Sequence, residues 1–231
     1  MQAIEVRGIT PDGLRSTIND GWFLIKNALN NEDTTALHKH IRTMAWKPHG
    51  MNDLYSSSYP RADSLLTKIR HPNLFALMHG TRVAIQSAAA DLDEPLLKRW
   101  GDKIISPSDP AQRPLLHMHL SVHRMRKYGF IEKHTDFFSY MGCGIVYNVT
   151  GTGSTKLTKP IGNESESLAR SEPINVISEP GDALLLCETK VFTIFDRIQV
   201  EKYPGQKPGH EIRNIGDSVR YSIPIFYEQR S

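Results

Sequence analysis

A series of short strand-like segments in the second half of the chain constrains the fold more than any other feature of the sequence. Residues 117–123 alternate polar with apolar side chains, and this period of two is typical of a β-strand. Further strand-like segments lie at 142–149, 174–177, 182–187 and 220–227. Turns rich in glycine and proline separate them. Short strands arranged in this way predict a sandwich or barrel of the jelly-roll type.

The N-terminal third differs, because its apolar residues recur at helical spacing. Residues 29–44 have an apolar face of this period, and either Asn30 or Asn31 is a suitable N-cap. Residues 72–92 form a second helical stretch. The short apolar run at 22–25 follows an Asp-Gly turn signal, so it predicts one strand.

We therefore predict one domain that spans residues 1–231, of the α+β class with a mainly β core. Residues 1–114 are expected to be a mostly helical flanking region, with a polar, proline-rich loop at 98–114. Residues 115–228 are expected to form the core.

Composition and charge exclude several classes of protein. The two cysteines, Cys143 and Cys187, cannot form a disulfide framework or a four-cysteine zinc site. The 28 Lys and Arg against 25 Asp and Glu leave a net charge of +3, too weak to indicate a nucleic-acid partner. The chain begins without the pattern of a signal peptide and has no apolar run long enough to span a bilayer. We expect a cytoplasmic protein with no membrane or nucleic-acid partner.

The ten histidines are the compositional surplus, and they raise the question of metal binding. His134 and Asp136 are two residues apart, so on an extended segment their side chains share one face. Two histidines and one carboxylate form the facial triad that binds Fe(II) and leaves other coordination positions open. A surface turn or a hydrogen-bonded pair explains the same motif. A second histidine from a distant strand is therefore needed, and His210 enters a predicted strand just after a Pro-Gly turn.

Arg220 and Ser222 are a second pair that shares a face if the segment is extended. The planar guanidinium suits a carboxylate, and the serine hydroxyl adds another donor. A surface salt bridge of Arg220 and an exposed turn at His210 are the simpler explanations of each residue taken separately. The order of these features along the chain is harder to explain in that way.

This order resembles the Fe(II)/2-oxoglutarate-dependent dioxygenase superfamily. It comprises His134-x-Asp136, Pro180-Gly181-Asp182 before an apolar strand, His210, and Arg220-x-Ser222 followed by Ile-Pro-Ile-Phe-Tyr. The resemblance covers residues 115–228, and residues 20–26 resemble the strand that precedes the first helix in many members. It implies a double-stranded β-helix, the cupin-like jelly roll, with flanking N-terminal helices.

The resemblance also implies roles for the site residues. His134, Asp136 and His210 would ligate Fe(II), and Arg220 and Ser222 would hold the distal carboxylate of the cosubstrate 2-oxoglutarate, with O2 as the oxidant. Tyr128 is a candidate second donor to 2-oxoglutarate. Because Asp136 is present, hydroxylation is favoured over halogenation, while desaturation and cyclisation stay open.

Two features depart from this pattern or compete with it. The stretch before His210 is longer than in many members, and residues 190–207 are a candidate hairpin inserted over the active site. His117, His119 and His123 would share one face of a strand, as metal ligands of cupins do. The first glutamate after them is Glu132, farther away than a cupin site requires. Within the dioxygenase resemblance, His119 or His123 is a candidate contact to substrate or cosubstrate.

The resemblance favours a small-molecule substrate such as an amino acid or a natural-product intermediate, and therefore a biosynthetic role. The nucleic-acid repair branch carries Arg-x-Asn where this chain has Arg220-x-Ser222. Two alternatives stay open. One is a protein or peptide hydroxylase of the same superfamily, and the other is a non-catalytic, jelly-roll or cupin-like metal-binding module.

Overall fold

The computed structural model describes residues 4–48, 54–59, 65–90, 116–134, 140–158, 172–187 and 209–229. The helices are α1 (Pro11–Asp20), α2 (Asn31–Ile41), α3 (Leu65–Arg70) and α4 (Pro72–Ala90). The strands of the larger sheet are β1 (Trp22–Ile25), β2 (Lys47–Pro48), β3 (Leu54–Tyr59), β4 (Leu116–Met125), β6 (Tyr140–Thr150), β9 (Ala183–Cys187) and β11 (Arg220–Gln229). Those of the smaller sheet are β5 (Phe130–His134), β7 (Gly153–Thr158), β8 (Ile174–Ser178) and β10 (Gly209–Asn214).

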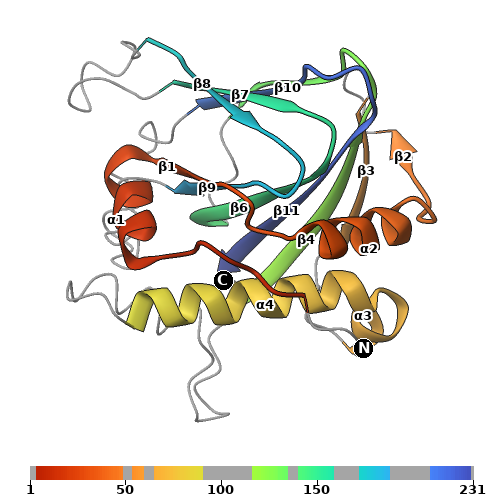
Figure 1. Cartoon of the computed structure of the whole chain (residues 1–231), viewed down its shortest axis with the longest axis horizontal. Coiled ribbons are helices and arrows are strands. Elements are labelled where there is room, and N and C mark those ends of the chain that lie inside the picture. Colours follow the sequence, from red (N-terminus) through yellow and green to blue (C-terminus); the bar gives the residue numbers. More distant parts are fainter. Residues whose placement is uncertain are drawn as a thin grey trace.

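The two sheets pack face to face, and helices cover the outer face of the larger one (Figure 1). The larger sheet has the order β1-β9-β6-β11-β4-β3-β2, and the smaller has the order β5-β10-β7-β8. The pairings within both sheets are antiparallel. This arrangement confirms the predicted α+β jelly roll with N-terminal helices.

Local capping signals define the first two helices. The Thr10 side chain accepts a hydrogen bond from the Gly13 N–H, and the left-handed Gly21, with φ of 84°, ends α1. At α2, the Asn30 side chain accepts from the Asp33 N–H at 2.8 Å, so Asn30 rather than Asn31 is the N-cap. The sequence analysis did not predict α1, although its cap residues are the expected ones.

The core has two layers, one on each face of the larger sheet. Between this sheet and the helices, the buried residues include Leu37, Ile41, Leu74, Leu77, Ile145, Tyr147, Leu185 and Ile223. Between the sheets lie Val146, Leu157, Val176, Leu184 and Leu186, and a separate cluster of Leu54, Met125, Ile131 and Ile212. In β6, therefore, odd-numbered residues face the helices and even-numbered residues face the smaller sheet.

Most of the predicted elements have counterparts in the structure. Helix α4 corresponds to the predicted stretch 72–92, β1 to 22–25, and β4 to 117–123. The strands β3 and β7 were not predicted. The predicted loop at 98–114 and the predicted hairpin at 190–207 lie outside the described residues. Within the described ranges, no helix is both long enough and apolar enough to cross a membrane.

Candidate functional site

The two predicted histidine ligands occupy opposite positions on neighbouring strands. In the antiparallel pair β10–β5, His210 is the partner of His134, and Ile212 is the partner of Ile131. A regular ladder continued from Ile131 and Ile212 would place Lys133 opposite His210. One extra residue in β5, a β-bulge, shifts the register and brings position 134 opposite His210 instead.

His210 lies inside the smaller sheet, because β10 pairs with β5 on one side and with β7 on the other. It is 5% exposed. Asp136 and the side chain of His134 lie outside the described part of the molecule, so the three-ligand set stays a prediction. Within the described part, no group of three or more His, Cys, Asp or Glu side chains is placed to hold a metal ion.

Arg220 reaches from the larger sheet to the smaller one. It is the first residue of β11, is 2% exposed, and its Nε donates a hydrogen bond to Oδ1 of Asn148 at 3.0 Å. Its guanidinium lies against Gly153 in β7. A Cβ atom at position 153 would stand 2.5 Å from Nε and 2.8 Å from Cζ of Arg220. The absence of a side chain at Gly153 therefore makes the space that the guanidinium occupies.

Arg220 is a buried cation without a carboxylate partner among the described residues. Burial lowers the pKa of Arg220 to about 10, so the group stays protonated near neutral pH. Its only hydrogen bond to a described residue is the one from Nε to Asn148, which leaves the donors of both Nη groups for another acceptor. Because an uncompensated buried charge is costly, this arrangement indicates a binding site for an anion.

Ser222 and two histidines lie beside Arg220 on the same face of the larger sheet. Ser222 is 2% exposed, and it stands between His123 of β4 and Asn148 of β6 in the register. His119 is half-buried further along β4, with its ring centroid 6.4 Å from that of Phe226. The structure thus places Arg220, Ser222, His119 and His123 on the inner face, whereas the side chain of His117 is outside the described part.

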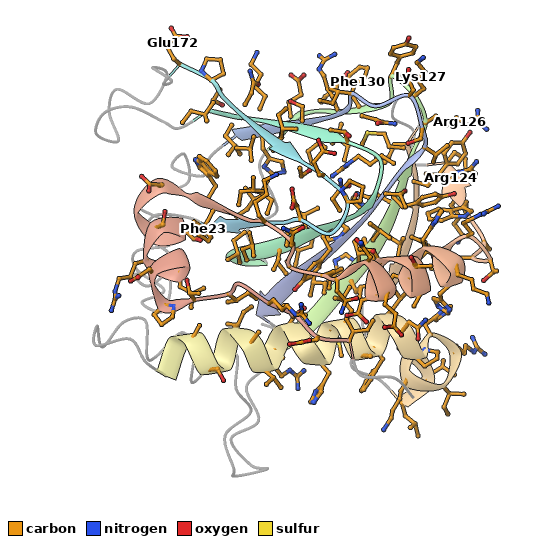
Figure 2. All side chains as sticks on the ribbon, viewed as in Figure 1. Phe23, Arg124, Arg126, Lys127, Phe130 and Glu172 are labelled. Carbon is orange, nitrogen blue, oxygen red and sulfur yellow. The ribbon has the colours of Figure 1, made fainter. Side chains whose placement is uncertain are left out.

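Tyr128 is not part of this group. It lies in the turn between β4 and β5, at a left-handed φ of 64°, and its side chain is 78% exposed. Its ring centroid is 5.0 Å from Nζ of Lys127. The neighbouring residues Lys127 and Phe130 lie at the outer edge of the molecule (Figure 2). We therefore leave Tyr128 out of the candidate site, because an exposed ring on a turn does not share the buried surroundings of Arg220.

Asn148 is the site residue that the sequence analysis missed. It is 0% exposed, and its side chain makes three hydrogen bonds, including the one with Arg220. The available signal was an amide inside the apolar segment 142–149, since a buried polar side chain requires partners. Gly153 gave no comparable signal, because a glycine next to a turn has many ordinary explanations.

Comparison with known proteins finds similarity in structure but not in sequence. No family model and no curated protein matches the sequence significantly. A prolyl-4-hydroxylase of Pseudomonas putida has a TM-score of 0.58 at 12% identity, covering 96% of this chain and 99% of that one. A 2OG-Fe(II) oxygenase family oxidoreductase of Burkholderia pseudomallei has a TM-score of 0.56 at 15% identity, covering 100% and 96%. SnoN, a non-heme alpha-ketoglutarate-dependent epimerase from nogalamycin biosynthesis, has a TM-score of 0.55 at 11% identity, covering 94% and 82%.

These similarities extend over nearly the whole chain. At such low identity they show the fold alone: the chain has the double-stranded β-helix fold of the 2OG-Fe(II) oxygenases. The resemblance drawn from the sequence is confirmed at the level of the fold. Function has to be argued from the site.

Proposed function

We propose that this protein is an Fe(II)- and 2-oxoglutarate-dependent oxygenase. The observation that carries the proposal is Arg220, a buried guanidinium in the space between the sheets with no carboxylate partner among the described residues. A dicarboxylate cosubstrate supplies the missing anion. The cradle left by Gly153 and the hydroxyl of Ser222 fit the same ligand.

His134, Asp136 and His210 would hold the iron. The register supports the histidine pair, because directly opposite residues of antiparallel strands have Cβ atoms about 5 Å apart. Bound Fe(II) with 2-oxoglutarate and O2 supplies oxidising chemistry that releases succinate and CO2. The fold also agrees, since the neighbours at nearly full length include 2OG-Fe(II) oxygenases.

The residues of this chain bind and orient the cosubstrate. Arg220 would donate from its Nη groups to the distal carboxylate, and Ser222 would add a hydroxyl donor. Hydrogen bonds between charged groups contribute about 1.5–3 kcal/mol each, and they are stronger where water is excluded. The apolar residues between the sheets, Val146, Leu157 and Leu184 among them, exclude water from this space.

We further propose a small-molecule substrate, such as an amino acid or a natural-product intermediate. The Arg220-x-Ser222 form supports it, and so does the similarity to SnoN and to SnoK, an alpha-ketoglutarate-dependent carbocyclase from the same pathway. A peptide substrate is the second candidate, favoured by the similarity to the prolyl-4-hydroxylase of Pseudomonas putida. Hydroxylation, desaturation and cyclisation are all compatible with the proposed ligands.

The test is succinate formation by the purified protein with Fe(II), 2-oxoglutarate and ascorbate. We expect slow turnover without substrate, loss of Fe(II) binding in His210→Ala, and a sharply raised 2-oxoglutarate requirement in Arg220→Ala. A protein that neither binds Fe(II) nor turns over 2-oxoglutarate is not an oxygenase, and the non-catalytic module then becomes the better description. Screening free amino acids against proline-containing peptides for stimulated succinate release separates the two substrate classes.

A further inference from the structure

Asn148 holds its side-chain amide in a single orientation. Its Nδ2 donates to the carbonyl oxygen of Gly151 at 2.7 Å and to that of Ser178 at 2.9 Å. Because both acceptors are carbonyls, the nitrogen must face them, and Oδ1 must face Nε of Arg220. The amide thereby connects β6 of the larger sheet with the turn before β7 and with the end of β8 in the smaller sheet.

The backbone of Asn148 is held as firmly as its side chain. Its N–H donates to the carbonyl of Asp182, and its carbonyl accepts from the N–H of Gly181, each at 2.8 Å. The Asp182 carboxylate in turn accepts from the Asn27 N–H at 3.0 Å and from Lys26 Nζ at 2.6 Å. Asn148 is therefore a fixed point against which the long side chain of Arg220 is placed.

The chemistry of an amide differs from that of a carboxylate in this place. A carboxylate at position 148 would form a buried ion pair with Arg220 and cancel the charge that an anionic ligand needs. It would also leave the carbonyls of Gly151 and Ser178 without a donor. The neutral Oδ1 instead engages Nε alone and leaves the positive charge and both Nη groups for a ligand.

We propose that Asn148 is a positioning residue, which orients Arg220 and preserves its charge so that the site selects a 2-oxo acid with a distal carboxylate. This inference rests on the proposed function. It predicts that selectivity for the distal carboxylate depends on a residue that does not itself contact the ligand. If Asn148 only ties the strands together, its replacement changes stability but not this selectivity.

The experiment compares Asn148→Asp, which keeps the shape, with Asn148→Ser, which is neutral but too short to reach Nε. Asn175→Asp, the same change at an exposed position of β8, is the matched control. The dissociation constants of 2-oxoglutarate and of 2-oxobutyrate, which lacks the distal carboxylate, are measured for each folded protein loaded with Mn(II). Their ratio is the selectivity.

We expect Asn148→Asp to lower the selectivity by about tenfold or more, the loss corresponding to one charge-assisted contact. Asn148→Ser should lower it less, and Asn175→Asp should leave it within twofold. With saturating 2-oxoglutarate, the kcat of Asn148→Ser for succinate formation should stay near that of the wild type while its KM rises. An unchanged selectivity ratio in either folded variant at position 148 overturns the inference.

The wild-type protein provides a test that does not depend on the folding of a variant. Because Nε is already held by Asn148, the Arg220 Nε–H should exchange slowly with water in NMR spectra recorded without ligand. Exchange as fast as that of exposed arginines overturns the inference. Failure of the wild type to bind 2-oxoglutarate refutes the proposed function instead, so the two failures can be told apart.

Discussion

Gly153→Ala is the substitution whose effect follows most directly from the structure. The new Cβ atom would stand 2.5 Å from Nε, 2.8 Å from Cζ and 3.0 Å from Nη2 of Arg220, whereas ordinary contact begins at 3.4 Å. The guanidinium must therefore move by about 0.9 Å, enough to break its 3.0 Å hydrogen bond with Asn148. Overpacking of this kind costs about 1–3 kcal/mol, or about 2–10 °C in Tm for a chain of this size.

The effect on cosubstrate binding should exceed the effect on stability. Because a displacement of about 1 Å in a binding group can cost about 100-fold, we expect the Kd of 2-oxoglutarate to rise by about 10- to 100-fold. Isothermal titration with Mn(II)-loaded protein measures this Kd, and thermal unfolding measures Tm. Gly216→Ala is the control, since its Cβ meets only Thr152 N at 3.2 Å and the Asn214 side chain at 3.7 Å. A Gly153→Ala protein that binds 2-oxoglutarate as tightly as the wild type would remove Arg220 from the cosubstrate site.

Three further predictions concern stability and the limits of the site. His40 Nε2 lies 3.2 Å from His71 Nδ1, and burial lowers the pKa of both imidazoles below the ordinary 6.5. The unfolded chain therefore binds more protons, and the free energy of unfolding should fall as pH drops below about 6.5; urea unfolding at pH 7.5 and 5.5 should show a smaller drop in a His40→Gln/His71→Gln variant, and an equal drop would contradict this cause. Asp182→Ala should cost about 3 kcal/mol, because it leaves buried donors without an acceptor, whereas Lys26→Ala, whose side chain is 56% exposed, should cost less than about 1 kcal/mol; equal losses in denaturant unfolding would refute the difference. Tyr128→Ala should leave the Kd of 2-oxoglutarate within twofold, and a larger increase would return this exposed residue to the site.

The elements that could be predicted are those whose signal is local. The period of two at 117–123 and the capping by Asn30 both act within a few residues, and β4 and α2 are where they indicated. α1 carried equally local signals in Thr10 and Gly21 and could have been predicted from them. β3 could not, because its serine-rich sequence has no apolar alternation and it forms a strand by pairing along β4.

The candidate site divides along the same line. The sequence by itself determined which residue types are present and in what order, and that order was enough to single out His134, His210, Arg220 and Ser222. Only the tertiary structure decided how they meet. The bulge in β5 brings position 134 opposite His210, a shift of one residue that depends on pairing between strands far apart in the chain. The burial of Arg220 against Gly153 and its hydrogen bond to Asn148 arise because the two sheets pack together, and no sequence pattern specifies contacts between sheets.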